Sequence, residues 1–268
     1  MTDEITIRRA ETLDDYRACQ HAQKVAWGIT DESYLIPLAT MVGVQHHGGL
    51  VLGAFDASGA ILGVSFAFLG RIHGRFCLYS QLTGVVPGQQ GKGIGNRLKQ
   101  YQREFARSEG LDSLAWSFDP LQAGNARFNL HHLGATSSRF IEDMYGRRTD
   151  ALNADTPTDR LIAEWPAVPD PSPRPELPGI DDLPRLIRTR IDEAGSPIPE
   201  GAIPAADLGP VALLEIPADI TSLRRDDPTR AAAWTSALRA AFPDAFARGY
   251  RAEGFHRDGD RGFYVLRR

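Results

Sequence analysis

The apolar positions of the chain change their spacing repeatedly, and each change marks a predicted strand or helix. Seven short apolar or alternating runs predict strands: Ile5–Arg8, Leu50–Phe55, Ala60–Leu69, Arg75–Val86, Leu111–Phe118, Ser138–Tyr145 and Leu161–Trp165. Four segments have helical spacing or helix-start signals: Thr12–Gly28, Thr30–Val44, Ile94–Phe105 and Asn125–Leu133. Asp56-Ala57-Ser58-Gly59 separates the second and third runs and is a typical turn sequence, so these two runs predict an antiparallel hairpin.

The prolines after residue 165 separate this first portion from a second one. They stiffen the chain and keep it out of a sheet interior: Pro166, Pro169, Pro171, Pro173, Pro175 and Pro178. Beyond them, Val211–Ile216 predicts a buried strand, Pro228–Ala247 a helix, and Tyr250–His256 with Gly262–Leu266 a hairpin. We therefore predict three parts, 1–166, 167–178 and 179–268. Because the last part has few large apolar residues, we expect it to pack on the first, extending its sheet or forming a homodimer contact.

Composition narrows the class of protein. Of the 268 residues, 42% are hydrophobic and 24% charged, as in a folded globular protein, and the formal charge of −4 predicts neither a nucleic-acid nor a membrane partner. The acidic N-terminus is unlike a signal peptide, so we expect a cytoplasmic protein. Cys19 and Cys77 are not arranged as a C-x-x-C pair, and no metal site is expected.

A glycine-rich segment lies between the strand Arg75–Val86 and the next helix. It reads Gln90-Gly91-Lys92-Gly93-Ile94-Gly95, and its glycines remove side chains where the helix begins. The amides of a first helical turn lack partners within the helix and favour negative charge, so the segment predicts a phosphate-binding loop, to which Lys92 adds a cation. Its spacing fits neither a Walker A loop, which needs a hydroxyl after the lysine, nor the dinucleotide pattern G-x-G-x-x-G.

This segment resembles the acyl-CoA signature Q/R-x-x-G-x-G/A of the GNAT superfamily of N-acyltransferases, and Gly84-Val85-Val86-Pro87 resembles the strand end before it. The element order agrees over residues 1–166. The resemblance implies an α/β (α+β) fold, with a mixed, mostly antiparallel twisted sheet flanked by helices, and here a smaller C-terminal α/β portion. It implies acetyl-CoA or another acyl-CoA as co-substrate and no metal. The expected acyl-CoA contacts are Val85, Val86, Gln90, Gly91, Lys92, Gly93, Ile94, Gly95 and Asn125.

In the family, the strand before the loop carries a bulge and splays from its neighbour, opening a wedge for the pantetheine arm. Gly84 permits such a distortion, or it simply relieves packing. Free amides at Val85 or Val86 would then bind the acyl carbonyl. The resemblance also implies that the helices Thr12–Gly28 and Thr30–Val44 line the acceptor side.

Acyl transfer to an amine also needs a general base and a general acid, for which the sequence offers several candidates. Tyr79 and Gln81 are on the same strand, whose alternate residues face the wedge, and Tyr79 is a candidate catalytic residue. Asp119 follows the strand Leu111–Phe118 and is a second candidate, although Asp119-Pro120 is also a common turn opener. The family commonly places a tyrosine acid where this chain has Leu130.

Three other residues are candidates for the general acid: His131, His132 and Tyr145. Alternatively, the thiolate leaves without a general acid, since a thiol pKa of about 8.5 makes it a tolerable leaving group. We name Tyr145 as the third candidate catalytic residue.

A further set of residues resembles a GNAT subgroup with a C-terminal extension, some of whose members are linked to N-succinylation of amino acids. The set comprises Trp116-Ser117-Phe118-Asp119-Pro120-Leu121, Tyr145-Gly146, Asp150, Leu152-Asn153 and Thr158-Asp159-Arg160. Gln81, Trp116 and Arg160 are the expected substrate contacts, and Arg160 either pairs with a carboxylate of the substrate or forms a structural arrangement with Asp159.

Together these features predict an N-acyltransferase that acts on a small amine, such as an amino acid, by direct attack in a ternary complex. Acetyl-CoA is the default donor and succinyl-CoA the competitor. The alternative is a GNAT-fold protein that binds acyl-CoA without turnover, as a sensor or assembly module.

Overall fold

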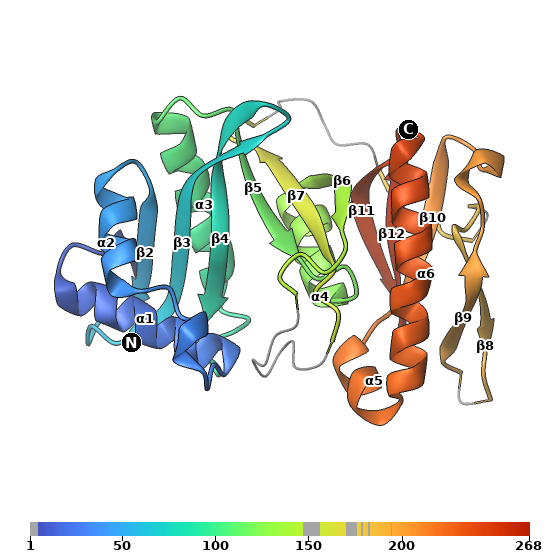
Figure 1. Cartoon of the computed structure of the whole chain (residues 1–268), viewed down its shortest axis with the longest axis horizontal. Coiled ribbons are helices and arrows are strands. Elements are labelled where there is room, and N and C mark those ends of the chain that lie inside the picture. Colours follow the sequence, from blue (N-terminus) through green and yellow to red (C-terminus); the bar gives the residue numbers. More distant parts are fainter. Residues whose placement is uncertain (1–4, 147–155, 170–175, 178, 182, 194) are drawn as a thin grey trace. The chain divides into compact units, whose positions relative to one another are not determined.

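The predicted strands of the N-terminal portion form a sheet in the order β1-β2-β3-β4-β5 (Figure 1). The strands are β1 (Thr6–Arg9), β2 (Leu50–Phe55), β3 (Ile61–Ile72), β4 (Arg75–Val85) and β5 (Ser113–Phe118). Neighbours are antiparallel up to β4, which pairs with β5 in parallel. The computed structural model describes residues 5–146, 156–169, 176–177, 179–181, 183–193 and 195–268.

Helices cover both faces of this sheet. On one face lie α1 (Leu13–Trp27) and α2 (Leu38–His46), and on the other lies α3 (Ile94–Ser108). The capping box predicted at Thr12 is present, with Asp15 as its second member, and Gly28 ends α1 in the left-handed conformation. The expected helix over residues 30–44 is interrupted. A short 3₁₀ turn, η1 (Glu32–Tyr34), comes first, and α2 starts only after Pro37.

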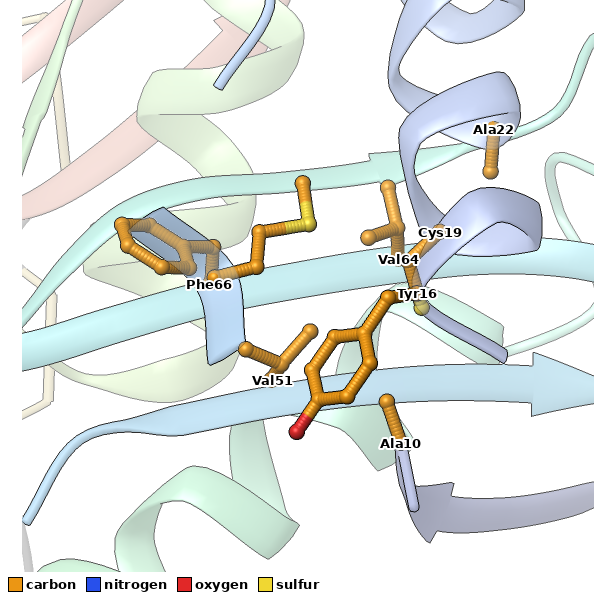
Figure 2. Packing of buried hydrophobic residues seen from close by; sticks show 8 residues of the cluster. Ala10, Tyr16, Cys19, Ala22, Val51, Val64 and Phe66 are labelled. Carbon is orange, nitrogen blue, oxygen red and sulfur yellow. The ribbon is translucent and has the colours of Figure 1, made fainter. Parts of the chain in front are cut away.

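The core of this sheet lies between the strands and α1 and α2. Figure 2 shows Tyr16, Cys19 and Ala22 of α1 against Val51 of β2 and Val64 and Phe66 of β3. All are buried, which is the pattern expected for an amphipathic helix on the alternating face of a sheet. Even-numbered residues of β3 around Phe66 therefore face α1 and α2, and the odd-numbered Ser65 faces α3.

The chain forms two units, and the chain first passes from unit 1 to unit 2 after Trp116, within β5; the described residues 166–169 again belong to unit 1. Unit 2 begins at Ser117 and has its own antiparallel strands in the order β7-β6-β11-β12-β10. They are β6 (Thr136–Ile141), β7 (Arg160–Pro166), β10 (Val211–Pro217), β11 (Arg251–Asp258) and β12 (Arg261–Arg267). Much of the proline-rich segment (residues 170–175 and 178) lies outside the described residues.

Strand β11 of the C-terminal portion pairs with β6 through Ala252 and Ser137, within unit 2. The core of this portion is richer than the sequence indicated. Six aromatic side chains are at most 2% exposed: Trp234, Phe242, Tyr250, Phe255, Phe263 and Tyr264. Phe242 stacks on Phe140 of β6, so this core is shared with the strands that precede the prolines.

The remaining elements of unit 2 are helices and one separate hairpin. The helices are α4 (Ala123–Ala126), the π-helical η2 (Arg127–Leu133), η3 (Ala205–Asp207), α5 (Ile220–Asp226) and α6 (Pro228–Ala247). The hairpin of β8 (Ile187–Ile191) and β9 (Pro197–Ala202) and helix α5 were not predicted. The predicted strand Ser138–Tyr145 stops at Ile141, where the chain turns. Within the described part of the chain, no helix has the length and apolar character needed to cross a bilayer.

Candidate functional site

The loop between β4 and α3 has the backbone that its glycines predict. Gly88, Gly91 and Gly93 have φ of +81°, +79° and +76°, a region that L side chains rarely adopt. No described atom lies within 4 Å of a Cβ built on any of the three, so the space beside the loop backbone is open. Gln90 braces the loop, since its Oε1 accepts from the Gly88 N–H at 2.8 Å and its Nε2 donates to the Val85 carbonyl at 3.3 Å.

The first turn of α3 begins directly after Gly93, and among the described residues no side chain caps it. Ile94 is 1% exposed and anchors this turn in the core, while a Cβ on Gly95 would touch only Val85 Cγ2, at 3.9 Å. Lys92 is exposed and donates to Gln89 Oε1 at 2.8 Å. Uncapped amides, the positive end of the helix dipole and a nearby cation together form a setting for a phosphate or pyrophosphate.

A β-bulge interrupts β4 just before the loop. Phe66 of β3 pairs with Leu82, and the next residue, Ala67, pairs with Ser80, so Gln81 is the extra residue of β4. A bulge bends its strand and strengthens its twist. The expected distortion is therefore present, but at Gln81 and not at Gly84.

Gly84 has a packing role instead. It pairs regularly with Val64, and a Cβ on it would lie 2.5 Å from Cη2 of Trp27 and 3.0 Å from Cβ of Ala26. The end of α1 thus approaches the β4 backbone too closely for any side chain at this position. Of the two interpretations of Gly84, the structure supports relief of packing.

The two amides expected to bind an acyl carbonyl are not equivalent. The Val86 N–H donates to the Leu62 carbonyl of β3 at 2.9 Å and is therefore occupied. Because antiparallel pairs alternate, the N–H groups of Thr83 and Val85 point away from β3, toward the β5 side. Among the described residues of unit 1, β4 pairs with β5 only through Leu78–Leu114 and Tyr79–Ala115, so no described strand of this unit pairs with this edge of β4 beyond Tyr79.

A buried polar cluster lies under the bulge, on the α3 face. Ser80 Oγ accepts from Lys99 Nζ at 2.9 Å and from Gln102 Nε2 at 3.0 Å, and it lies 3.3 Å from Thr83 Oγ1. Gln102 also donates to Ser65 Oγ at 2.6 Å, and Ser65 lies 2.9 Å from Thr83 Oγ1. Lys99 is 3% exposed, and burial lowers the pKa of its ammonium to about 7.

The predicted site residues of unit 1 divide between the two faces of the sheet. Tyr79 lies opposite Phe68, on the face covered by α1 and α2, and the two rings are 5.5 Å apart. Trp116, expected to contact substrate, is only 5% exposed, and its ring lies 3.9 Å from Lys99 Nζ. It therefore shields the lysine as a cation–π partner.

Sequence reasoning missed Lys99. Its helical position is one step beside the apolar stripe of Ile94, Leu98 and Phe105, where a lysine is usually taken as solvated. A signal was present, because Lys99, Gln102 and Ala106 form a second stripe at spacings of three and four, and all three are buried. A polar stripe directed at the serines and threonine of a strand is a sign of a buried network.

In unit 2, Asp119 opens a turn and forms an ion pair. Its Oδ1 accepts from the Leu121 N–H at 2.8 Å, and its Oδ2 lies 3.0 Å from Arg224 of α5. The next carbonyl, of Pro120, accepts from the Tyr264 hydroxyl at 2.6 Å. Both oxygens of Asp119 are thus engaged in structure, as its interpretation as a turn opener requires.

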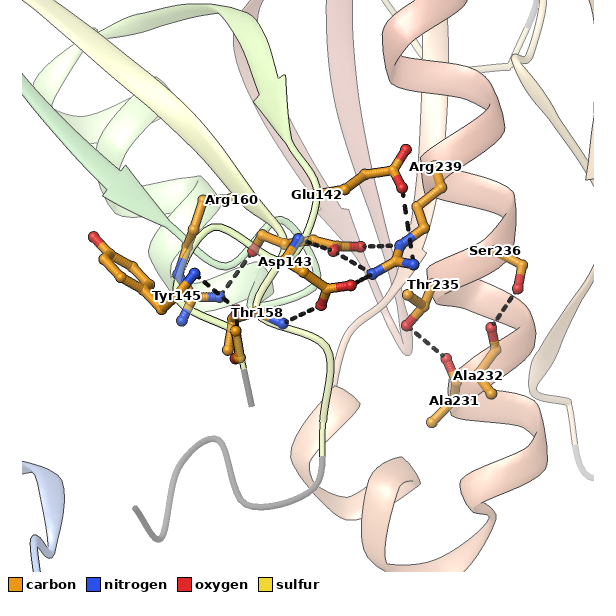
Figure 3. Close-up of polar contacts among 12 residues, drawn as sticks. Glu142, Asp143, Tyr145, Thr158, Arg160, Ala231, Ala232, Thr235, Ser236 and Arg239 are labelled. Carbon is orange, nitrogen blue, oxygen red and sulfur yellow. Dashed lines mark hydrogen bonds and ion pairs between the residues drawn. The ribbon is translucent and has the colours of Figure 1, made fainter. Parts of the chain in front are cut away.

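Tyr145 and Arg160 belong to a polar cluster that Figure 3 shows. The Tyr145 hydroxyl lies 2.8 Å from Ser117 Oγ, and the Arg160 guanidinium lies 5.4 Å from the Tyr145 ring. Arg160 is 8% exposed and donates to the Asp159 carbonyl at 2.8 Å. These contacts match the structural arrangement considered for Arg160. Asp150, Leu152 and Asn153 of the same predicted set lie outside the described residues.

Arg239 of helix α6 forms ion pairs with two aspartates of this cluster. Its guanidinium donates to Asp159 at 2.7 and 2.9 Å and to Asp143 at 2.8 Å, as Figure 3 shows. Asp143 has a φ of +43°, which is unusual for a residue with a side chain. One function of the C-terminal portion is therefore to hold the turns after β5 and β6.

Replacing Arg239 with Met should lower the free energy of unfolding by roughly 1–3 kcal/mol, because Asp159 is only 7% exposed and would lose its bidentate partner. Urea denaturation measures this loss. Arg225→Met is the matched control, since Arg225 is 71% exposed and, among the described residues, forms an ion pair only with its neighbour Asp226, so its effect should stay within about 0.5 kcal/mol. Equal effects of the two substitutions would contradict the assignment.

Four further positions discussed from the sequence lie in α4 and η2. Leu130 is 1% exposed and fills the core. His131 and His132 are exposed, and His132 stacks on Phe128 with the ring centroids 5.6 Å apart. Asn125, the expected acyl-CoA contact of this region, is exposed. Among the described residues, no group of His, Cys, Asp or Glu is arranged to hold a metal ion.

Comparison with solved structures identifies the fold. A putative acetyltransferase from Salmonella typhimurium, solved with its cofactor acetyl-CoA, matches with a TM-score of 0.50 and 21% identity, over 64% of this chain and 98% of that one. The chain has the GNAT fold. An N-acetyltransferase from Staphylococcus aureus Mu50 gives the same TM-score at 15% identity, over 62% of this chain and 99% of that one.

The predicted GNAT fold is confirmed, and about a third of this chain extends beyond these matches. No family model matches the sequence. No curated protein matches it either.

Proposed function

We propose that this protein is an acyl-CoA-dependent N-acyltransferase, which moves an acyl group to the amine of a small molecule such as an amino acid. Acetyl-CoA is the first donor to test and succinyl-CoA the second. The observation that carries the proposal is the loop before α3, with open space beside its three left-handed glycines and uncapped amides at Ile94 and Gly95. This donor set suits the pyrophosphate of an acyl-CoA.

The chain's own groups supply binding and orientation. The loop amides and Lys92 would hold the pyrophosphate, and the outward N–H groups of Thr83 and Val85 would polarise the acyl carbonyl. In other acyl-transfer enzymes, loss of one such donor costs about 2.7–4 kcal/mol of transition-state stabilisation. Holding both reactants in place supplies about 7–11 kcal/mol in intramolecular analogues.

We propose direct attack of the amine on the thioester. Both cysteines are buried, and burial raises the pKa of the Cys19 thiol to about 12, so neither thiol is suited to carry the acyl group. The acceptor amine must then reach the carbonyl itself, in a complex that holds both substrates.

Gly93→Glu tests the loop. It places a carboxylate where the phosphate would bind, so we expect the affinity for acetyl-CoA, measured by calorimetry, to fall at least about 100-fold. Gly110→Glu is the matched control, since Gly110 has a φ of +69° just beyond the other end of α3 and equally open surroundings. It carries the same backbone strain and the same charge and should keep its affinity within about threefold. Unchanged affinity in Gly93→Glu would refute the proposed site.

The second candidate is an acyl-CoA sensor without turnover, and Leu130 favours it, because a buried leucine replaces the acid that the family commonly uses. Purified protein is mixed with acetyl-CoA or succinyl-CoA and a panel of amines, and the release of free thiol is followed. Turnover with any pair supports the transferase. Tight binding without thiol release on every pair supports the sensor.

A further inference from the structure

Lys99 is chemically unlike the other lysines of the chain, Lys24 and Lys92, which lie at the surface. It is 3% exposed, and within the described residues no acidic side chain lies at ion-pair distance from it. Arg103, one turn along α3, directs its guanidinium away, to the carbonyls of Pro166 and Ala167 at 2.9 and 3.2 Å. An ammonium buried without a counterion readily gives up its proton near neutral pH, which is the property of a proton acceptor.

The hydrogen bonds around Lys99 can run in two directions. While Lys99 is protonated, Ser80 Oγ accepts from Lys99 and Gln102, so its own hydrogen is left for Thr83 Oγ1, 3.3 Å away; when Lys99 is neutral, Ser80 can donate to the lysine nitrogen and accept from Thr83. Lys99, Ser80 and Thr83 therefore form a line of exchangeable protons. Among the described residues, the other groups in contact with this line are uncharged: Ser65 from β3, Trp116 from β5 and Gln102 from α3.

The line reaches its outer end at Thr83. Thr83 is partly exposed, whereas Ser80 and Lys99 are buried. The Thr83 N–H points away from β3, toward the same edge as the Val85 N–H, because backbone hydrogen bonds of an antiparallel pair alternate and Val86 donates to Leu62 of β3. The residue at the outer end of the proton line thus also carries one of the amides assigned to the acyl carbonyl.

We propose that Lys99, through the hydroxyl groups of Ser80 and Thr83, takes up the proton that the amine nitrogen loses during acyl transfer and returns it to the departing sulfur. The inference rests on the proposed transferase function. One C–N bond forms, one C–S bond breaks, and one proton passes from nitrogen to sulfur, so Lys99 ends each turnover as it began. This role would replace the acid absent at Leu130.

The same contact could instead be a Ser–Lys pair in which Ser80 is acylated. The structure disfavours this. Ser80 Oγ has three polar neighbours within 3.3 Å, and the residue is 2% exposed, so no room remains for an acyl group. A relay needs only the movement of hydrogens.

The first test measures the lysine directly. With three lysines in the chain, carbon-13 labelling of the lysine ε-carbon gives three signals, and Lys24→Met and Lys99→Met assign two of them by their absence. In the full chain we expect the Lys99 signal to titrate near pH 7. A Lys99 signal that titrates only above pH 9 would overturn the inference, whatever the activity.

The second test measures turnover at saturating substrates from pH 5.5 to 9. The wild-type kcat should rise through pH 7 as Lys99 loses its proton, and Lys99→Met should lower kcat about 100-fold and abolish this rise, while the affinity for acetyl-CoA stays within about threefold. Thr83→Val should act in the same direction, because valine keeps the shape and removes the hydroxyl. Thr235→Val on α6, whose hydroxyl donates to the Ala231 carbonyl at 3.3 Å, is its matched control and should leave the profile unchanged.

The outcomes separate the two proposals. If the wild type turns over and Lys99→Met keeps both its kcat and its rise through pH 7, the relay is wrong and the transferase stands. If the wild type releases no thiol with any amine, the transferase fails, and the relay fails with it. An acyl adduct on Ser80, detected by mass spectrometry after incubation with acetyl-CoA alone, would replace the relay with a covalent route.

Discussion

Arg261→Met is expected to lower the free energy of unfolding by roughly 3–5 kcal/mol, because it removes the bidentate partner of the most deeply buried carboxylate of the described chain. Glu215 on β10 is 0% exposed. Arg261 of β12 donates to both of its oxygens, at 2.5 and 2.7 Å, and this hydrogen bonding raises the pKa of the Arg261 guanidinium. Among the described residues, Glu215 then keeps two weaker side-chain contacts, Arg185 at 3.4 Å and the Thr189 hydroxyl at 2.8 Å.

Replacing the other partner, Glu215, should lower the free energy of unfolding by less. Glu215→Gln leaves two arginines that are 26% and 28% exposed, and such long side chains can turn their charge toward water, so we expect a loss of roughly 1–3 kcal/mol. Chemical denaturation of both single variants and of the double variant gives the coupling energy. Arg190→Met, at an exposed pair with Glu200, is the control and should change stability by less than about 1 kcal/mol. If the double variant loses the sum of the two single effects, the pair is not coupled and the explanation fails.

The parts of this protein that could be predicted are those in which local chemistry decides the structure. The capping box at Thr12, the Asp56 turn and the glycine loop each follow from residues a few positions apart, and the structure contains all three. The GNAT fold was accessible for the same reason, since its signature lies in one segment.

The sequence predictions fail where residues far apart in the chain determine the structure. Gly84 owes its presence to Trp27, 57 positions earlier, and the bulge at Gln81 depends on the register with β3, which no local pattern encodes. The sequence around Asp119 fits both a turn and a catalytic role, and the ion pair that distinguishes them is formed with Arg224, which lies beyond the prolines. The hairpin of β8 and β9 was missed because Pro197 and Gly201 lie within it and weaken the strand signal.

Lys99 shows the same limit for function. Its identity predicts a surface cation, and only the contacts with Ser80 and Trp116 reveal a buried amine. Proteins that keep such a group accept a cost in stability, because an apolar side chain of the same length would fill the space without desolvating a charge. That cost has a sign and a pH window that can be measured.

Lys99→Met should therefore make the protein more stable at pH 7, by roughly 2–4 kcal/mol. The folded-state pKa of about 7 lies below the ordinary 10.5, so between these values the unfolded chain holds a proton that the folded chain lacks. At about 1.36 kcal/mol for each pKa unit, the penalty approaches roughly 5 kcal/mol at pH 7 and below, and it vanishes above pH 10.5. The substitution also removes the Ser80 hydrogen bond and the Trp116 contact, each of which stabilises the wild type by about 1 kcal/mol. The expected gain in stability is therefore smaller than the full penalty.

Urea unfolding of Lys99→Met and the wild type at pH 6, 7, 8, 9 and 10 tests this expectation. Equal m-values of the two proteins would show that the difference is one of stability. The advantage of Lys99→Met over the wild type should be constant below pH 7 and shrink toward pH 10, because stability of the wild type rises with pH wherever the unfolded state binds more protons. Other titrating groups cancel in the difference. Lys24→Met, at an exposed lysine whose partner is Glu32, is the control and should give only a small difference. A pH-independent difference for Lys99→Met would show that the lysine stays charged in the folded protein, and the relay built on its neutral form would be lost with it.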